Sequence, residues 1–222
     1  MDWTVLKNPD EVARVACQRI LAAAEQAIEK RGAFNIVLAG GSTPEKTYKL
    51  LSQESSNWKD WHVWFGDERC LPKTHSDRNS LMIEQVFTSK VPIPEEQVHI
   101  IPAELGAVAA AEHYAKLLKG VVKFDMVLLG MGEDGHTASL FPNSKETEGK
   151  TVLPIFDAPK LPSERVSLSA ERLSQCAYMV FIITGNNKFD AVSRWQSGEE
   201  LPVSMVHGID KTEALADQSV FN

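Results

Sequence analysis

The sequence predicts an α/β fold, with a doubly wound, mainly parallel sheet and helices on both faces. Short apolar runs alternate with helical patterns along the 222 residues, as expected for successive βαβ units. The run at 127–129 is continuous and branched, which is typical of a strand that is buried on both sides. Gly130, Gly132, Gly135 and then His136 follow it directly. Such sheets bind ligands at the carboxyl ends of their strands.

Each element follows from its own pattern. Apolar residues at helical spacing predict a helix over residues 10–30 that ends before Gly32. Further helices are predicted over residues 44–52, 77–87, 107–118 and 186–195. Strands are predicted at 34–39, 61–65, 98–101, 124–129, 166–168, 178–184 and 203–206. The polar, proline-containing segment 143–163 is expected to be a long surface excursion.

Composition limits the class of protein. With 43% hydrophobic and 24% charged residues, the chain is expected to form one soluble domain over residues 1–222. A net charge of -7 argues against nucleic acid and anionic membranes as partners. No signal peptide or apolar span is recognisable, so we expect a cytoplasmic protein, either a monomer or a small homo-oligomer. Cys17, Cys70 and Cys176 are far apart and are expected to be reduced.

The glycine-rich loop after the strand at 124–129 carries two groups suited to proton transfer. Asp134 precedes His136 by two residues. A carboxylate can fix the tautomer of an imidazole, so the two residues are candidates for a general-base pair. The alternative is an ordinary glycine-rich turn in which Asp134 caps the next helix.

The loop after the strand at 34–39 is a candidate anion site. Gly40 and Gly41 allow close backbone approach, and Ser42 or Thr43 can cap a helix whose first turn contains Pro44. The amides and dipole at such a helix start suit a phosphate. The alternative is a capped turn without a ligand. Neither a P-loop nor a GxGxxG fingerprint is present, so we expect no nucleotide site and no cofactor.

Charged side chains follow other predicted strands. Asp67 and Arg69 come after the strand at 61–65, and Asp67 can polarise a hydroxyl or water while Arg69 can bind phosphate or carboxylate. Arg165 begins the strand at 166–168, and Lys188 follows the strand at 178–184. Taken singly, these residues can equally be surface charges or a helix-start cluster. The remaining histidines lack metal-ligand spacing, so we expect no metal site and interpret them as structural or exposed: His62, His75, His99, His113 and His207.

The order and the amino-acid sequences of these loops resemble those of the 6-phosphogluconolactonases, which share a superfamily with glucosamine-6-phosphate deaminase. The matching segments are Ala39-Gly-Gly-Ser-Thr-Pro44, Phe65-Gly-Asp-Glu-Arg69, Gly130-Met-Gly-Glu-Asp-Gly-His-Thr-Ala-Ser-Leu-Phe-Pro142, Arg165-Val-Ser-Leu168 and Ile183-Thr-Gly-Asn-Asn-Lys188. The resemblance implies a Rossmann-like sheet without a dinucleotide. It also implies hydrolysis of 6-phospho-D-glucono-1,5-lactone in the oxidative pentose phosphate pathway.

The resemblance also implies roles for individual residues. His136 resembles the general base that activates water, and Asp134 resembles its orienting partner. Asp67 falls at the acid position of the superfamily, and Arg69 resembles a contact to the phosphorylated sugar. The family's phosphate-binding positions correspond to Gly41, Ser42, Arg165 and Lys188. The mechanism expected from this pattern is metal-free transfer of the lactone acyl group to water.

Two alternative functions remain open. The deaminases carry a glutamate five residues after the corresponding histidine, where this chain has Phe141, so the lactonase is favoured. A non-catalytic sugar-phosphate sensor would retain the anion loops and lose the base, which the presence of Asp134 and His136 argues against. One departure from the family pattern is Arg78 before Asn79, where a Ser-Asn pair is usual. The contacts of the loop at 74–82 are therefore left open.

Overall fold

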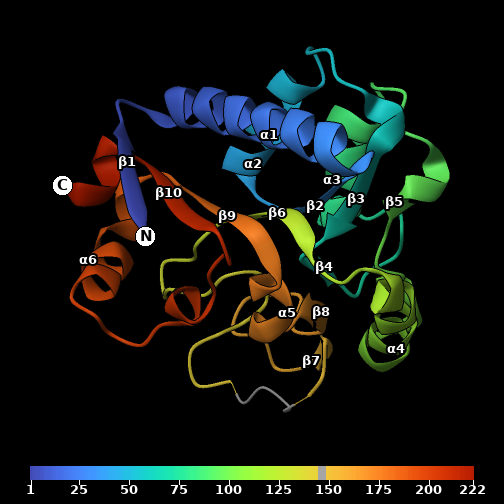
Figure 1. The fold of residues 1–222 in the computed structure, drawn as a ribbon. Helices are drawn as coiled ribbons and strands as arrows, with labels where there is room; N and C mark the ends of the chain where they lie inside the picture. Colours follow the sequence, from blue (N-terminus) through green and yellow to red (C-terminus); the bar gives the residue numbers. More distant parts are fainter. Residues whose placement is uncertain (145–148) are drawn as a thin grey trace.

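A seven-stranded parallel sheet forms the centre of the computed structural model, which describes residues 1–144 and 149–222. Its order is β1-β10-β9-β6-β2-β3-β5 (Figure 1). The strands are β1 (Asp2–Leu6), β2 (Phe34–Leu38), β3 (Trp61–Phe65), β5 (Val98–His99), β6 (Phe124–Leu129), β9 (Cys176–Ile183) and β10 (Lys211–Asp217). The predicted α/β class and parallel sheet are confirmed.

The chain winds in two directions from the middle of this sheet. From β2 it proceeds outward through β3 to β5, then returns to β6 and proceeds the other way through β9 to β10. The neighbours β2 and β6 therefore flank the point where the strand order reverses. A crevice forms at the carboxyl ends of the strands at such a point. The loops after β2 and β6 are the two glycine-rich loops noted in the sequence.

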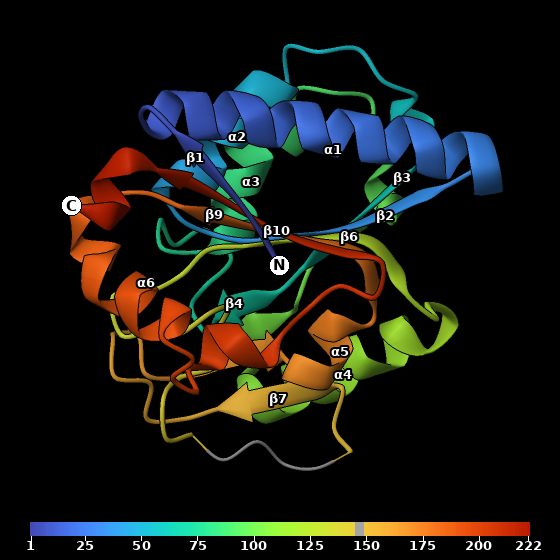
Figure 2. The same cartoon turned by 60° about the vertical axis from the view of Figure 1, so that its left-hand side comes forward.

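Helices cover both faces of the sheet (Figure 2). One face carries α1 (Pro9–Arg31), α2 (Ser42–Leu51) and α3 (Asn79–Ile83), and the other carries α4 (Ala107–Leu117), α5 (Ala170–Ser174) and α6 (Phe189–Gln196). Shorter helices connect these elements at Trp58–Asp60, Glu84–Thr88, Glu95–Gln97, Ala103–Leu105, Leu118–Gly120, Asn186–Lys188, Pro202–Met205 and Gln218–Phe221. None of the helices in the described ranges is long and apolar enough to cross a membrane.

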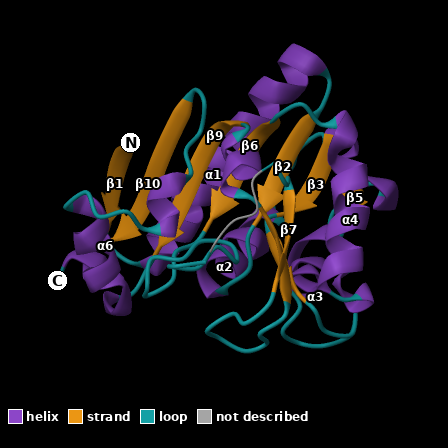
Figure 3. Cartoon of the chain, turned by 90° about the horizontal axis from the view of Figure 1, so that it is seen from below, coloured by secondary structure: helices purple, strands orange, loops and turns teal. Residues whose placement is uncertain are grey.

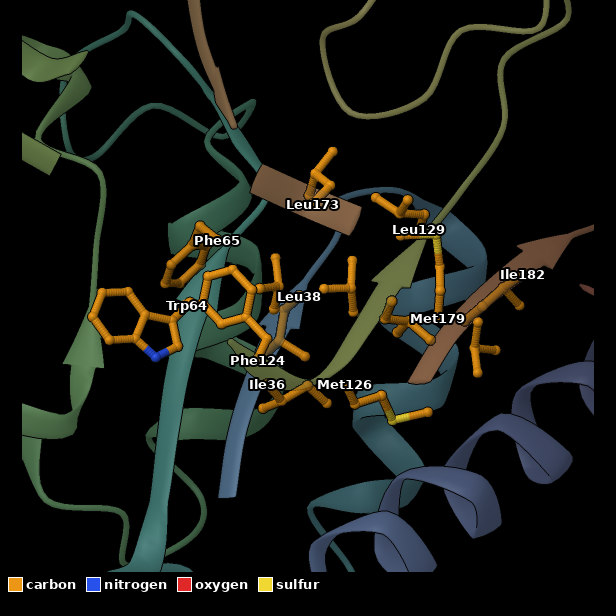
Figure 4. Packing of buried hydrophobic residues seen from close by; sticks show 14 of the residues in the cluster. Ile36, Leu38, Trp64, Phe65, Phe124, Met126, Leu129, Leu173, Met179 and Ile182 are labelled. Atoms are coloured by element: carbon orange, nitrogen blue, oxygen red, sulfur yellow. The ribbon is translucent and has the colours of Figure 1, made fainter. Parts of the chain in front are cut away.

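The core lies between the sheet and its helices. Figure 4 shows side chains of neighbouring strands in this core, with Ile36 of β2 beside its register partner Met126 of β6, while Leu38 of β2 and Trp64 of β3 project to opposite faces of the sheet. Each of these four side chains is buried. The long helix α1 begins because the Asn8 side chain accepts the Glu11 amide, and it ends at Gly32 in the left-handed conformation. The packed core therefore fixes the central strands, and with them the starting points of the loops at their carboxyl ends.

A second, antiparallel sheet lies beyond the carboxyl ends of the parallel strands (Figure 3). Its order is β4-β8-β7, from β4 (Asp67–Arg69), β8 (Arg165–Leu168) and β7 (Val152–Ile155). The register places Arg69 directly opposite Arg165. The strand predicted at 166–168 is confirmed as β8, but it belongs to this antiparallel sheet and not to the parallel one. Instead, β8 brings a second cation beside the loop that follows β3.

The prediction was also wrong at the last strand. Residues 203–206, predicted as a strand, belong mainly to the short helix Pro202–Met205, and the Val203 amide donates to Gly135 O at 3.0 Å. Their apolar character reflects packing against the His136 loop. The true strand, β10, was missed because it begins with polar residues. Its Glu213 is buried and paired with Arg19 and Lys211, so an apolar run does not mark the strand.

Smaller differences concern element ends. The helix predicted over 77–87 is α3 followed by the π-helical turn Glu84–Thr88, because the extended backbone of Arg78 holds residues 77–78 outside it. The strand predicted at 98–101 is the two-residue β5. The excursion predicted at 143–163 contains β7, and its residues 145–148 lie outside the described ranges. Neither β1 nor α5 was predicted.

The histidines expected to be structural or exposed are placed accordingly. His62 and His99 are partly buried, and their ring nitrogens Nδ1 and Nε2 lie 3.3 Å apart. Burial, with a further contribution from the charge of His62, lowers the pKa of His99 to about 4. His75, His113 and His207 are exposed. The three cysteines are free, and Cys17 lies in the core under α1 as predicted.

Candidate active site

A cavity of about 320 Å³ opens at the carboxyl ends of the central strands. It collects side chains from the loops after β2 and β6, from the neighbouring strands β4 and β8 of the second sheet, and from the start of α3. Its lining includes Gly40, Gly41, Asp67, Arg69, Asn79, Gly130, Met131, Gly132, His136, Thr137, Ala138, Lys160, Leu161, Arg165 and Lys188. The predicted candidates His136, Asp67, Arg69, Arg165 and Lys188 are therefore brought together in one place.

His136 and Asp134 form the pair predicted from the glycine-rich loop. Nδ1 of His136 lies 2.5 Å from Oδ1 of Asp134, and the His136 amide donates to the same oxygen at 3.1 Å. An ionised carboxylate only accepts hydrogen bonds, so Nδ1 carries the proton and Nε2 keeps its lone pair. Gly132 permits this arrangement, because a Cβ at that position would overlap the imidazole. The alternative, in which Asp134 caps a helix, is wrong because no helix follows the loop before residue 143.

The surroundings keep this imidazole neutral. Burial lowers the pKa of His136, Asp134 and Asp67 oppose that effect, and the charge of Lys160 adds to it. Burial acts to raise the pKa of Asp134, but the charge and hydrogen bonds of His136 outweigh it, and the net pKa is lowered. At neutral pH the pair therefore consists of a neutral imidazole and a carboxylate, the state that a general base needs.

Phe141 forms an apolar wall beside the base. Its ring centroid lies 4.7 Å from that of His136, and the Arg165 guanidinium carbon lies 5.6 Å from the same phenyl centroid. Phe141 lies five residues after His136, and its side chain is buried. This wall supplies no carboxylate next to His136.

Asp67 is held by two residues that the sequence prediction did not propose for the site. Its Oδ1 accepts from the side-chain Nδ2 of Asn79 at 3.2 Å, and its Oδ2 accepts from the Ser139 hydroxyl at 2.6 Å. All three residues are buried. Ser139 belongs to the histidine motif itself, so its proximity to the histidine was the available signal. Asn79 belongs to the loop at 74–82 whose contacts the sequence left open.

Arg78 fixes the loop at 74–82 through a buried ion pair with Glu68 of β4. Side chains alternate along β4, so Asp67 and Arg69 face the cavity while Glu68 points away from it. Glu68 is completely buried and accepts Nε of Arg78 at 3.1 Å and the Asn79 and Ser80 amides at 2.8 Å. The Arg78 Nη atoms also contact Glu104 Oε2 and the carbonyls of Leu71 and Ile101. The Glu68–Arg78 pair therefore holds the cavity wall from behind.

The candidate anion loop lies where predicted, with one correction. Gly41, at φ +113°, is the N-cap of α2, while Ser42 and Thr43 occupy the first turn and do not cap it. Gly40 and Gly41 line the cavity, whereas Ser42 is exposed and Thr43 is buried against Thr184, with their hydroxyl oxygens 2.6 Å apart. The N-terminal amides of α2, rather than the hydroxyls, are placed to meet an anion.

The cavity cations differ in how they are held. Nη1 of Arg69 donates to Asp77 O at 2.6 Å. Arg165 is buried and donates from Nε to Pro162 O at 3.0 Å and from Nη2 to Lys160 O at 2.8 Å. Lys188 is half-buried, and burial lowers its pKa. Lys160 was not predicted, because it lies in the segment interpreted as a surface excursion.

The site thus combines a neutral imidazole, a buried carboxylate and four cations. Within the described ranges, no three or more His, Cys, Asp or Glu side chains are grouped so that they could hold a metal ion. The arrangement can remove a proton from a bound water and hold an anionic ligand in the same cavity.

Comparison with protein families agrees with this geometry. Residues 7–215 match the family described as glucosamine-6-phosphate isomerases/6-phosphogluconolactonase. The chain is 40% identical over 200 residues to the probable 6-phosphogluconolactonase 4, chloroplastic, of Oryza sativa subsp. indica, covering 79% of this chain and 62% of that protein. It is 32% identical over 205 residues to the 6-phosphogluconolactonase of Nostoc sp., covering 87% and 85% of the two chains. The chain spans less than two thirds of the length of the chloroplastic relatives.

Solved structures share the fold over almost the whole chain. The 6-phosphogluconolactonase of Thermotoga maritima superposes with a TM-score of 0.91 at 28% identity, covering 98% of this chain and 99% of that one. A monomeric glucosamine-6-phosphate deaminase superposes with a TM-score of 0.85 at 18% identity, covering 99% and 98%. The second likeness concerns the fold alone.

Proposed function

Because the chain belongs to the family of glucosamine-6-phosphate isomerases and 6-phosphogluconolactonases, we propose that it hydrolyses 6-phospho-D-glucono-1,5-lactone to 6-phosphogluconate. The reaction belongs to the oxidative pentose phosphate pathway. The observation that carries the proposal is the His136–Asp134 pair in a cavity lined by cations. The phenyl ring of Phe141 beside His136 favours the lactonase over the deaminase, whose glutamate it replaces.

In the proposed mechanism, Nε2 of His136 takes a proton from a water that attacks C1 of the lactone. Asp134 stabilises the imidazolium that results and keeps the ring oriented. The bond between C1 and the ring oxygen then breaks, and the imidazolium returns the proton to that oxygen, which becomes the C5 hydroxyl. The carbonyl oxygen, negative in the intermediate, is stabilised by backbone amides of the glycine loops or by a cavity cation. No step uses a metal ion.

The substrate phosphate anchors the lactone in this mechanism. The amides at the start of α2, with Gly41 as N-cap, provide one set of donors. Arg69, Arg165 and Lys188 line the same cavity and supply positive charge. Asp67, fixed by Asn79 and Ser139, is placed to hold a sugar hydroxyl or the attacking water. Anchoring of this kind converts the attack into a positioned, effectively unimolecular step.

The pH dependence should follow the neutral imidazole. Since the pKa of His136 is lowered from 6.5, its base form persists below that pH. We expect kcat to stay level above pH 6.5 and to fall as the pH drops through the lowered pKa. Measurement at saturating substrate separates this group from the second ionisation of the free substrate phosphate, near pH 6. An acid limb centred above pH 7 would contradict the assignment of His136 as the base.

The activity itself is tested with freshly generated 6-phosphogluconolactone, by coupling to 6-phosphogluconate dehydrogenase and subtracting spontaneous hydrolysis. We expect a rate far above background with the lactone and no ammonia release from glucosamine 6-phosphate. The reverse pattern would identify a deaminase. Tight binding of sugar phosphates without turnover of either compound would identify a sensor.

The remaining properties expected from the sequence stay predictions. We propose one domain over residues 1–222 that acts in the cytoplasm as a monomer or small homo-oligomer. The net charge of -7 supports the expectation that nucleic acid and membranes are not partners. Several relatives are named as chloroplastic, so fractionation of the source cells would test the compartment.

A further inference from the structure

The cavity carries more positive charge than the sequence motifs described above account for. Four of its lining residues are cations, namely Arg69, Lys160, Arg165 and Lys188. They form two pairs. Arg69 and Arg165 are opposite each other in the β4–β8 ladder, whereas Lys160 and Lys188 are close enough for their charges to interact. Lys160 is the member of the second pair that no motif predicted.

The backbone around Lys160 is held in place by Arg165. The guanidinium donates to Lys160 O at 2.8 Å, to Leu161 O at 3.4 Å and to Pro162 O at 3.0 Å. Arg165 is only 4% exposed, and its own backbone is fixed by pairing with β4 and β7. Most of the guanidinium's donors therefore serve the loop. The loop in turn presents Lys160 at the cavity.

The ammonium of Lys160 has no carboxylate partner among the described residues. The lysine ion pairs there are formed by Lys46, Lys49, Lys73 and Lys211. Glu133 is within electrostatic range of both Lys160 and Lys188, but it is exposed and accepts from Asn187 at 2.6 Å.

The charges of Lys160 and Lys188 repel each other, although Glu133 and Asp134 attract Lys188 and offset part of this repulsion. The charge of Lys160 contributes to lowering the pKa of Lys188 and of His136. A dianion between the two lysines would relieve this repulsion. The substrate's phosphate has that charge at neutral pH. The 2.6 Å contact between the Thr43 and Thr184 hydroxyls also ties the start of α2 to the segment that leads to Lys188.

We propose that Lys160 binds the phosphate of the substrate together with Lys188, and that Arg165 is the positioning residue of the loop that carries Lys160. The inference rests on the proposed lactonase function. It assigns substrate recognition to the loop between β7 and β8, outside the motifs that follow the parallel strands.

Lys160→Met tests the inference, with Lys160→Arg as the charge-conserving variant. Lys150→Met is the matched control, because Lys150 is an exposed lysine just before β7 that does not line the cavity. We expect Lys160→Met to raise KM for 6-phosphogluconolactone roughly 10–100-fold, the effect of one charge-assisted hydrogen bond. Lys160→Arg should recover most of the loss, and Lys150→Met should match wild type.

The pH profile distinguishes the loss of phosphate binding by Lys160 from a structural change in the loop that carries it. Lys160 lowers the pKa of His136, while Asp134 and Asp67 raise it. Lys188, Arg69 and Arg165 are the other charges that line this cavity. Removal of the Lys160 charge should therefore move the acid limb of kcat/KM to higher pH. Ionisation of the free substrate is the same for every variant, so a difference between the acid limbs of wild type and Lys160→Met reports a change in the enzyme.

The outcomes separate this inference from the proposed function. If wild type does not hydrolyse the lactone, the proposed function fails. If wild type is active and Lys160→Met leaves KM unchanged, Lys160 does not bind the phosphate and the inference is overturned. A raised KM with an unmoved acid limb, or without recovery in Lys160→Arg, would show a structural effect of the loop and would also overturn it.

Discussion

His136→Asn is expected to lower kcat for lactone hydrolysis by about 10²–10⁴-fold, the usual contribution of a positioned general base. The substitution removes Nε2, the only proposed proton acceptor for the water, while the asparagine amide can still donate to Asp134 in place of Nδ1. It leaves the lysines and arginines of the cavity in place, so KM should stay near the wild-type value. Initial rates at saturating lactone, corrected for spontaneous hydrolysis, measure the effect.

His113→Asn is the control for this variant, because His113 is exposed on α4 and outside the cavity. It should retain wild-type kcat and KM. Circular dichroism and the thermal midpoint establish that His136→Asn is folded. A folded His136→Asn enzyme with more than about one tenth of wild-type kcat would be inconsistent with general-base catalysis by this residue.

Arg78→Met is expected to lower the free energy of unfolding by about 3–5 kcal/mol, as found when a buried ion pair loses one partner. The Arg78 side chain is 1% exposed, and that of its partner Glu68 is 0% exposed. Without the guanidinium, Glu68 keeps the Asn79 and Ser80 amides but loses its positive partner. Urea unfolding monitored by tryptophan fluorescence measures the change.

Two further variants serve as the control and the rescue for Arg78→Met. Arg14→Met, at an exposed position of α1, should change stability by less than about 0.5 kcal/mol. Glu68→Gln combined with Arg78→Met removes the unpaired charge and should recover part of the loss. If Arg78→Met costs less than about 1 kcal/mol, the buried pair does not hold the cavity wall in the way the structure indicates.

The sequence was most informative where a strand runs directly into its functional loop. The apolar run before Gly130 identifies β6 and shows that the loop lies at its carboxyl end. The carboxyl ends of parallel strands meet at one edge of the sheet. Local patterns were therefore sufficient to place Gly41, Asp67 and His136 around one cavity. The Asp134–His136 pair is separated by a single residue, so its geometry is set almost entirely within one loop.

The contacts that the sequence did not disclose join segments far apart in the chain. Ser139 reaches Asp67 across 72 positions, and Arg78 meets Glu104 across 26. The strand β10 was missed because its buried Glu213 is balanced by Arg19, a residue of a distant helix. Periodicity reports what one segment buries, and it does not report which charge on another segment makes that burial possible.

The charge of the cavity also affects how a substrate reaches it. The chain as a whole carries a net charge of -7, yet among the described residues that line the cavity Asp67 is the only carboxylate, and four are cations. A dianionic molecule diffusing toward most of the outer surface is repelled, while one near the mouth of the cavity is drawn inward. At physiological ionic strength the attraction extends only about 8 Å. Productive encounter is thereby favoured at the mouth of the cavity, and the net negative charge disfavours nonspecific adhesion of other polyanions.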